Sequence, residues 1–165
     1  MPIRTFGDPV LRMKAQPVER FDDALRRLAD DMLETMYDAP GVGLAAPQIG
    51  KSIRLFVFDI GEGPGAVANP VLSGLSGEQD GDEGCLSVPG LYFPLRRAMH
   101  ARVEGRDLSG HPVVYEGDEL MGRMLQHEFD HLEGMLLLQR LDRDEYRRAM
   151  ATLRDQTLGL DPEPR

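Results

Sequence analysis

The pattern of apolar and polar positions predicts helices near both ends of the chain and strands between them. Over residues 21–36, apolar residues recur at helical spacing, and this face comprises Phe21, Ala24, Leu25, Leu28, Met32, Leu33 and Met36. Acidic residues near its start and a Pro-Gly pair at 40–41 are typical helix boundaries. The same periodicity returns over 118–134 and about 142–155. The chain is therefore expected to form three amphipathic helices.

The middle of the chain carries the shorter apolar runs that are typical of strands. Residues 53–60 (IRLFVFDI) and 67–72 (VANPVL) are expected to be buried strands, and 98–107 and 111–119 a hairpin joined through Leu-Ser-Gly. Residues 73–84 are polar and glycine-rich, so we expect a flexible crossing there. This order predicts an α+β fold, in which mostly antiparallel strands pack around the second helix, with helices at both termini.

Length and composition indicate one domain over residues 1–165, with a flexible tail from about residue 156. The 19 basic and 28 acidic residues give a net charge of −9, which argues against nucleic acid or an anionic membrane as a direct partner. We find neither a signal-peptide core nor the ~18–20 apolar residues of a membrane span. The one cysteine, Cys85, excludes an intrachain disulfide and fits a reducing compartment, so we expect a cytoplasmic protein.

The second predicted helix contains the run LQHEFDHLEG, in which two histidines are four residues apart. Residues at this spacing lie on one face of a helix, so His127 and His131 can both reach one metal ion. Glu128 follows the first histidine, and its carboxylate can reach a water beside the metal without binding the metal. The alternative is a helix that happens to carry two surface histidines.

A metal site of this kind needs a third protein ligand. The metzincin pattern requires a histidine where this chain has Leu137, and leucine cannot bind a metal. A thermolysin-like zinc peptidase would need a downstream glutamate, for which Glu145 is the candidate, although its run is typical of a solvated helix face. His100 lies in a strand pattern and His111 at a turn, and both are more typical of structural histidines. Cys85 becomes the natural third ligand, because a thiolate binds Fe²⁺ or Zn²⁺ strongly.

Three motifs carry a resemblance to the peptide deformylase family. GVGLAAPQ (41–48) matches G-x-G-x-A-A-x-Q, EGCLS (83–87) matches E-G-C-L-S, and QHEFDHL (126–132) matches Q-H-E-x-D-H-L. All three are complete, and they stand in the family's order. The resemblance extends over most of the chain. It implies a metal-dependent hydrolase that removes the N-formyl group from the N-terminal formylmethionine of newly made proteins and releases formate.

The resemblance also implies roles for individual residues. It implies one divalent metal ion, Fe²⁺ in cells with Zn²⁺, Ni²⁺ or Co²⁺ as substitutes, bound by Cys85, His127 and His131. Glu128 matches the family's general base and acid. Gln48 and the backbone N–H of Leu86 match the donors that stabilise the oxyanion formed during hydrolysis.

For the substrate, the resemblance implies an extended peptide that pairs with the glycine-rich first motif and a methionine pocket beside the metal helix. The expected substrate-binding residues are Val42, Gly43, Gly84, Leu120, Arg123 and Met124. Arg123 departs from an apolar lining, and its guanidinium would either reach solvent or meet a substrate carbonyl. Tyr92 and Phe93 stand near the position where some members have a substrate-contacting arginine, with Arg96 and Arg97 further on.

Two further features have alternative interpretations. Asp130 would either orient a ligand histidine or face solvent. The last helix would offer the ribosome a docking surface through Arg140, Arg143, Arg147 and Arg148, or these arginines form a solvated mixed-charge face with their acidic neighbours. The expected partner is the nascent formyl-methionyl polypeptide, and we expect a monomer. The rival functions are the zinc peptidase and a metal-holding protein without catalysis.

Overall fold

The computed structural model describes residues 1–159 and contains three α-helices, three short 3-10 helices and seven strands in this part of the chain. The α-helices are α1 (Asp23–Asp38), α2 (Glu119–Leu132) and α3 (Arg143–Thr157). The 3-10 helices are η1 (Pro9–Arg12), η2 (Ala46–Ile49) and η3 (Leu137–Arg140). The strands are β1 (Gly43–Ala45), β2 (Leu55–Phe58), β3 (Gly65–Ser76), β4 (Asp82–Cys85), β5 (Val88–Pro94), β6 (His100–Arg106) and β7 (Pro112–Asp118).

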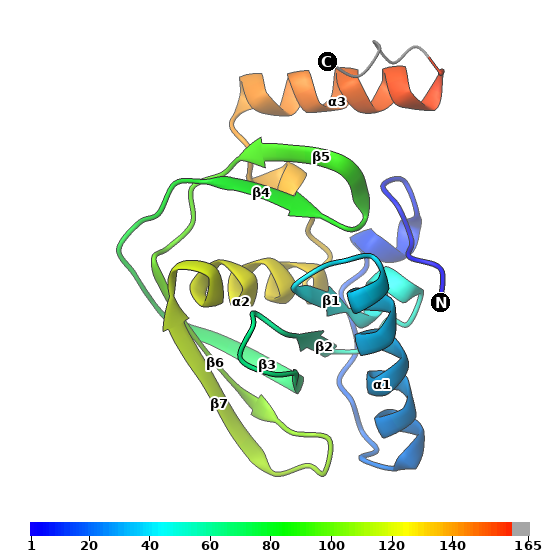
Figure 1. Cartoon of the computed structure of the whole chain (residues 1–165), viewed down its shortest axis with the longest axis vertical. Coiled ribbons are helices and arrows are strands. Elements are labelled where there is room, and N and C mark those ends of the chain that lie inside the picture. The colour runs from blue at the N-terminus through cyan, green and yellow to red at the C-terminus, as the bar shows by residue number, and fades with distance from the viewer. Residues whose placement is uncertain (160–165) are drawn as a thin grey trace.

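The strands form two separate antiparallel sheets with α2 between them (Figure 1). The larger sheet has the order β1-β2-β3-β6-β7, and the smaller one is the β4–β5 hairpin. The hairpin expected near residues 98–119 is present as β6 and β7, paired from His100–Asp118 to Arg106–Pro112. The predicted α+β fold around a central helix is confirmed.

The position of α2 follows from its two faces. Its apolar face packs on the larger sheet in a buried cluster that includes Met124, Leu125, Leu132, Phe56 and Val103. The helix is followed by Gly134, whose φ of +76° favours glycine and ends the helix where the sequence predicted. The opposite face of α2 turns its polar side chains toward the β4–β5 hairpin.

The first helix also follows its sequence pattern. The Asp22 side chain accepts a hydrogen bond from the Leu25 backbone N–H at 3.1 Å, which caps the helix start. The buried side of α1 packs against β1 and β2 in a cluster that includes Leu25, Ala29, Met32 and Met36. This packing fixes the glycine-rich segment that follows α1 against the larger sheet.

The expectation of a flexible crossing over residues 73–84 was wrong. Its beginning continues β3, where Ser73 pairs with Arg102 and Ser76 with His100. Its end forms β4, and between them Gln79 donates through its side chain to the carbonyl of Ala98 at 3.0 Å. Strand pairing with β6 and β5 outweighs the weak strand propensity of this glycine-rich stretch.

The C-terminal part of the described structure is helical. α3 extends to Thr157, past the start of the predicted tail, and residues 160–165 of that tail lie outside the described residues. Across residues 1–159, we find no helix with the length and apolar character needed to cross a membrane.

Candidate active site

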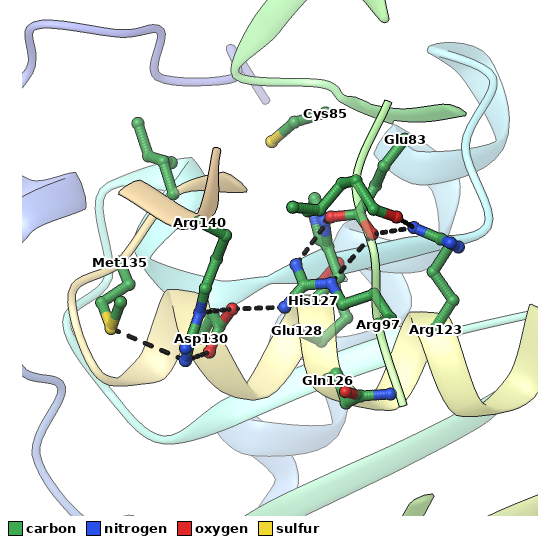
Figure 2. Close-up of polar contacts among 12 residues, drawn as sticks. Glu83, Cys85, Arg97, Arg123, Gln126, His127, Glu128, Asp130, Met135 and Arg140 are labelled. Atoms are coloured by element: carbon green, nitrogen blue, oxygen red, sulfur yellow. Dashed lines mark hydrogen bonds and ion pairs between the residues drawn. The ribbon is translucent and has the colours of Figure 1, made fainter. Parts of the chain in front are cut away.

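Three side chains that could bind a metal ion converge between the hairpin and α2. Cys85 ends β4, and His127 projects from α2 (Figure 2). His131 lies four residues further along the same helix. The two Nε2 atoms are 3.2 Å apart, and the Cys85 sulfur lies 3.4 Å from Nε2 of His131. The donor atoms of all three residues lie within 4.8 Å of one another. The structure therefore brings together the three residues that the sequence singled out.

One imidazole of this cluster is oriented by a buried carboxylate. Glu83, two residues before Cys85 on β4, lies with Oε2 at 2.8 Å from Nδ1 of His127. A carboxylate at this distance holds the proton on Nδ1, so Nε2 keeps its lone pair for the cluster. Burial works against a charge on His127, yet Cys85 and Glu83 outweigh it and raise its pKa well above the usual value. A cation bound to Nε2 would take the place of the second proton of the charged imidazole and leave the Nδ1 proton with Glu83.

Glu128 lies beside the cluster in a strongly desolvated position. Its side chain is 2% exposed, and Oε1 is 3.7 Å from Nε2 of His127. Its second oxygen, Oε2, is buried and has no hydrogen-bond partner among the described residues. Burial raises the pKa of Glu128 to about 7. A carboxyl group with this pKa can both accept and return a proton near neutral pH.

The backbone of β1 touches Glu128 so closely that only glycine fits there. A Cβ atom on Gly43 would lie 2.9 Å from Cδ and 3.0 Å from Oε1 of Glu128. Because Glu128 is buried, it has little room to move away.

We therefore expect Gly43→Ala to displace the Glu128 carboxylate and to lower kcat by about 10²-fold, the usual effect of a ~1 Å misplacement. Steady-state kinetics with a formyl-methionyl peptide, the substrate that the motif resemblance implies, would measure this. Gly81→Ala is the matched control, because a Cβ there meets its nearest atom at 3.5 Å. Equal kinetics for both variants would contradict the proposed contact effect.

The amide of Gln48 is held in one orientation by two contacts. Its Oε1 accepts from the Ala45 backbone N–H at 2.9 Å, and its Nε2 donates to the Ser87 hydroxyl at 3.1 Å. Nε2 also donates to the Cys85 sulfur at 3.7 Å, so the amide stands beside the cluster of Cys85, His127 and His131. Leu86 and Ser87 form the two-residue turn between β4 and β5. Of the two N–H groups of Gln48, one thus donates to Ser87 and the other points toward the Cys85 sulfur and the cluster.

A pocket of about 260 Å³ opens beside Glu128 and His127. All the expected substrate-binding residues line it, namely Val42, Gly43, Gly84, Leu120, Arg123 and Met124. Val42 and Leu120 are 42% and 46% exposed at its rim, whereas Met124 is 3% exposed at its floor. Gly84 leaves space for the Tyr92 ring, since a Cβ there would lie 2.5 Å from that ring.

Comparison with known proteins identifies the family. The family model described as polypeptide deformylase matches residues 1–147 of the chain. The chain belongs to this family. A peptide deformylase of Acidothermus cellulolyticus is 54% identical over 154 residues, or 93% of this chain and 86% of the relative.

Solved structures with the same fold lead to the same family. A crystal structure of peptide deformylase from Thermus thermophilus has a TM-score of 0.90 at 48% identity and covers 96% of both chains. One from Legionella pneumophila has a TM-score of 0.88 at 41% identity, over 97% of this chain and 98% of the other. The resemblance carried by the three motifs is confirmed, and the protein is a deformylase that hydrolyses the formyl amide at the N-terminal methionine of polypeptides.

Two expectations about polar residues of the deformylase need correction. Arg123 does not reach solvent: its Nη1 donates to Oε1 of Glu83 at 3.0 Å and to the Leu95 carbonyl at 2.9 Å. Its Nη2 has no partner among the described residues, so the alternative, a contact with a substrate carbonyl, stays a prediction. Asp130 neither contacts a ligand histidine nor faces solvent, because it is 3% exposed and accepts hydrogen bonds from Arg97 and Arg140. In both cases a buried partner of opposite charge decides the position, and that partner is distant in sequence.

The remaining candidate ligands lie elsewhere. His100 is on β6 between Asp118 and Glu116, and His111 is exposed before β7. Glu145, the third ligand of the zinc-peptidase alternative, is on α3 and pairs with Arg148. Within residues 1–159, the group of possible ligands around the two α2 histidines includes only Cys85 in addition.

Reasoning from the sequence missed three residues that shape the site. Glu83 and Ser87 lie inside the EGCLS motif, so the motif itself was a signal that they matter. Arg97, which is 6% exposed and pairs with Glu83, was noted only as an arginine beyond the expected substrate loop. A single sequence offers no pattern that distinguishes it from its exposed neighbour Arg96.

Proposed function

We propose that this deformylase hydrolyses formyl-methionyl polypeptides at the cluster of Cys85, His127 and His131. The observation that carries the assignment is the convergence of these three donor atoms within 4.8 Å, directly beside the buried Glu128. One sulfur and two imidazole nitrogens suit a single divalent ion, and we propose Fe²⁺ in cells, with Zn²⁺, Ni²⁺ or Co²⁺ as substitutes. An ion held there would lower the pKa of a water molecule and polarise the formyl oxygen.

Glu128 is the proposed general base and acid. It takes a proton from the attacking water, whose oxygen forms the new bond to the formyl carbon. When the carbon–nitrogen bond breaks, Glu128 delivers that proton to the departing nitrogen, so the products are formate and a free amine. Its burial, its unpartnered Oε2 and its pKa of about 7 support both steps.

Gln48 and the backbone N–H of Leu86 are the proposed donors to the formyl oxygen. Negative charge builds on this oxygen as the water attacks, and donors already in place stabilise it without reorganising. The contacts of Gln48 with Ala45 and Ser87 support this role, because they fix the amide before the substrate arrives. A neutral donor here also avoids competition with the cation.

The pocket beside Glu128 is proposed to take the methionine side chain, while the peptide backbone pairs with an open strand edge. β1 is the first strand in the order of the larger sheet, so one of its edges has no strand partner within residues 1–159. Main-chain hydrogen bonds along this edge would not depend on substrate side chains. This arrangement supports action on many different nascent chains that share one N-terminal residue.

The test of this assignment is formate release by metal-loaded enzyme from two matched peptides, formyl-Met-Ala-Ser and formyl-Gly-Ala-Ser. Burying the methionine side chain contributes about 1.5–3 kcal/mol, so kcat/KM should be roughly 10–150-fold higher for the methionine peptide. Equal values for the two peptides would contradict the assignment of this pocket to the methionine side chain. No formate release from either peptide would contradict the assignment of the active site.

Several expectations remain predictions. We propose that residues 1–165 form one catalytic domain and that the enzyme is a cytoplasmic monomer. Ribosome docking by the C-terminal arginines has less support, because Arg140 is engaged by Asp130 and Arg148 by Glu145. Arg143 and Arg147 are exposed and remain the candidates for such a contact.

A further inference from the structure

The three proposed ligands are divided between two parts of the fold that share no strand pairing. Cys85 lies on the β4–β5 hairpin, which is a sheet of its own, while His127 and His131 lie on α2, which packs on the larger sheet. The distance from the sulfur to the imidazoles therefore depends on the side chains that join the hairpin to the helix. Any loosening of that junction would spread the three donor atoms apart.

Arg97, just beyond the end of β5, joins these two parts through a buried guanidinium (Figure 2). Its Nε and Nη2 donate to the two oxygens of Glu83 at 3.0 and 2.7 Å. Its Nη1 donates to Oδ2 of Asp130 at 2.7 Å. The side chains of all three residues are at most 5% exposed. One planar group thus bridges a carboxylate of β4 and a carboxylate of α2, which suits arginine and no other cation.

Both carboxylates stand next to proposed ligands. Glu83 lies two residues before Cys85 and is bonded to Nδ1 of His127 at 2.8 Å. Asp130 immediately precedes His131 on α2, and its other oxygen accepts from Arg140 at 2.8 Å. A chain of contacts therefore runs from His127 through Glu83 and Arg97 to Asp130, with Cys85 and His131 beside its two ends.

A second arginine contributes to this junction but cannot replace the first. Arg123 of α2 donates to Oε1 of Glu83 at 3.0 Å and to the Leu95 carbonyl. Arg123 makes no hydrogen bond to Asp130 in the described structure. It lines the substrate pocket, whereas Arg97 does not. Changes at Arg97 should therefore affect the cluster directly and the pocket only through Glu83, which lines it.

We propose that Arg97 is a positioning residue that clamps β4 to α2 and thereby sets how firmly the three ligands hold their metal ion. The proposal rests on the assignment of Cys85, His127 and His131 as metal ligands. Loss of a group in the second layer around a metal typically lowers affinity by about 10–100-fold. Lysine would not restore the clamp, because its single ammonium cannot bond two carboxylates in the fixed geometry of the guanidinium fork.

The test measures Co²⁺ release from the loaded enzyme to an excess of chelator, for wild type, Arg97→Met, Arg97→Lys and Asp130→Asn. Arg96→Met is the matched control, since Arg96 is exposed and pairs with the exposed Asp80 and Glu78. We expect release about 10–100-fold faster for Arg97→Met, faster release for Arg97→Lys and Asp130→Asn, and the wild-type rate for Arg96→Met. The thiolate-to-cobalt absorption band should weaken or shift in the Arg97 variants, and kcat should fall while KM stays near its wild-type value.

The experiment distinguishes failure of the clamp proposal from failure of the underlying ligand assignment. Wild-type release and an unchanged absorption band in folded Arg97→Met would overturn the clamp, and if that variant does not fold, unchanged release from both Arg97→Lys and Asp130→Asn would do so. The underlying ligand assignment is tested in the same series by Cys85→Ser. If that variant holds Co²⁺ as wild type does, and the wild type lacks a thiolate band, the ligand assignment fails and the clamp proposal fails with it.

Discussion

Replacing Glu128 by glutamine should lower the rate of formate release by about 10³-fold while the protein stays folded and keeps its metal ion. General acid–base catalysis contributes roughly 10²–10⁴-fold, and glutamine has the shape of glutamate without a proton to exchange. The side chain is buried against β1, with Gly43 directly opposite its carboxylate. An isosteric amide should therefore occupy the same space and leave the pocket intact.

The same substitution should not destabilise the fold. A carboxylate that is 2% exposed, with one oxygen lacking a partner, is costly to bury, and the neutral amide removes most of that penalty. We expect the melting temperature of Glu128→Gln to equal or exceed that of wild type. Metal content by elemental analysis, thermal melts and single-turnover formate release would measure the three effects separately.

Glu34→Gln is the matched control, because Glu34 is exposed on α1. It should show wild-type kinetics and metal content. A Glu128→Gln variant that retains metal and still releases formate at more than a tenth of the wild-type rate would assign the proton transfer to another group. Loss of metal from this variant would instead mean that Glu128 helps to hold the ion.

The relative positions of site residues can be predicted from the sequence where those residues lie close together on one helix. His127 and His131 share a helix face because of their spacing, and the periodicity of α2 is unambiguous over its full length. Glu128 follows from the same short run. For these residues, helix geometry alone fixes the relative positions, and no tertiary information is needed.

The rest of the site depends on contacts between distant segments. The sequence singled out Cys85, but this residue reaches the histidines only because the β4–β5 hairpin folds over α2. The first strand of that hairpin, β4, consists mainly of acidic residues and glycine, which have little strand propensity. Asp130 and Arg123 have ordinary helical positions in the sequence. Their burial follows from Arg97 and Glu83, which lie 33 and 40 residues away along the chain. Such pairings have no local signature in a single sequence.

Cys85→Ser should abolish retention of the metal ion. The loss of metal affinity should exceed the ~100-fold that accompanies removal of a residue that only orients a ligand. Serine has nearly the shape of cysteine, so the β4–β5 turn should keep its structure. Its hydroxyl stays protonated at neutral pH, however, and cannot supply the anionic sulfur that binds Fe²⁺ or Zn²⁺. Metal stoichiometry after dialysis against a weak chelator would measure the loss, and activity should fall in proportion to it.

The matched variant is Glu145→Gln, because the zinc-peptidase alternative makes the opposite prediction for this pair. If the third ligand came from α3, Glu145→Gln would lose the metal and Cys85→Ser would keep it. Glu145 instead pairs with Arg148, and the Cys85 sulfur lies 3.4 Å from His131. We therefore expect full metal content in Glu145→Gln. A Cys85→Ser enzyme that binds one equivalent of metal as tightly as wild type would show that the sulfur is not needed and that the ion is held by other groups.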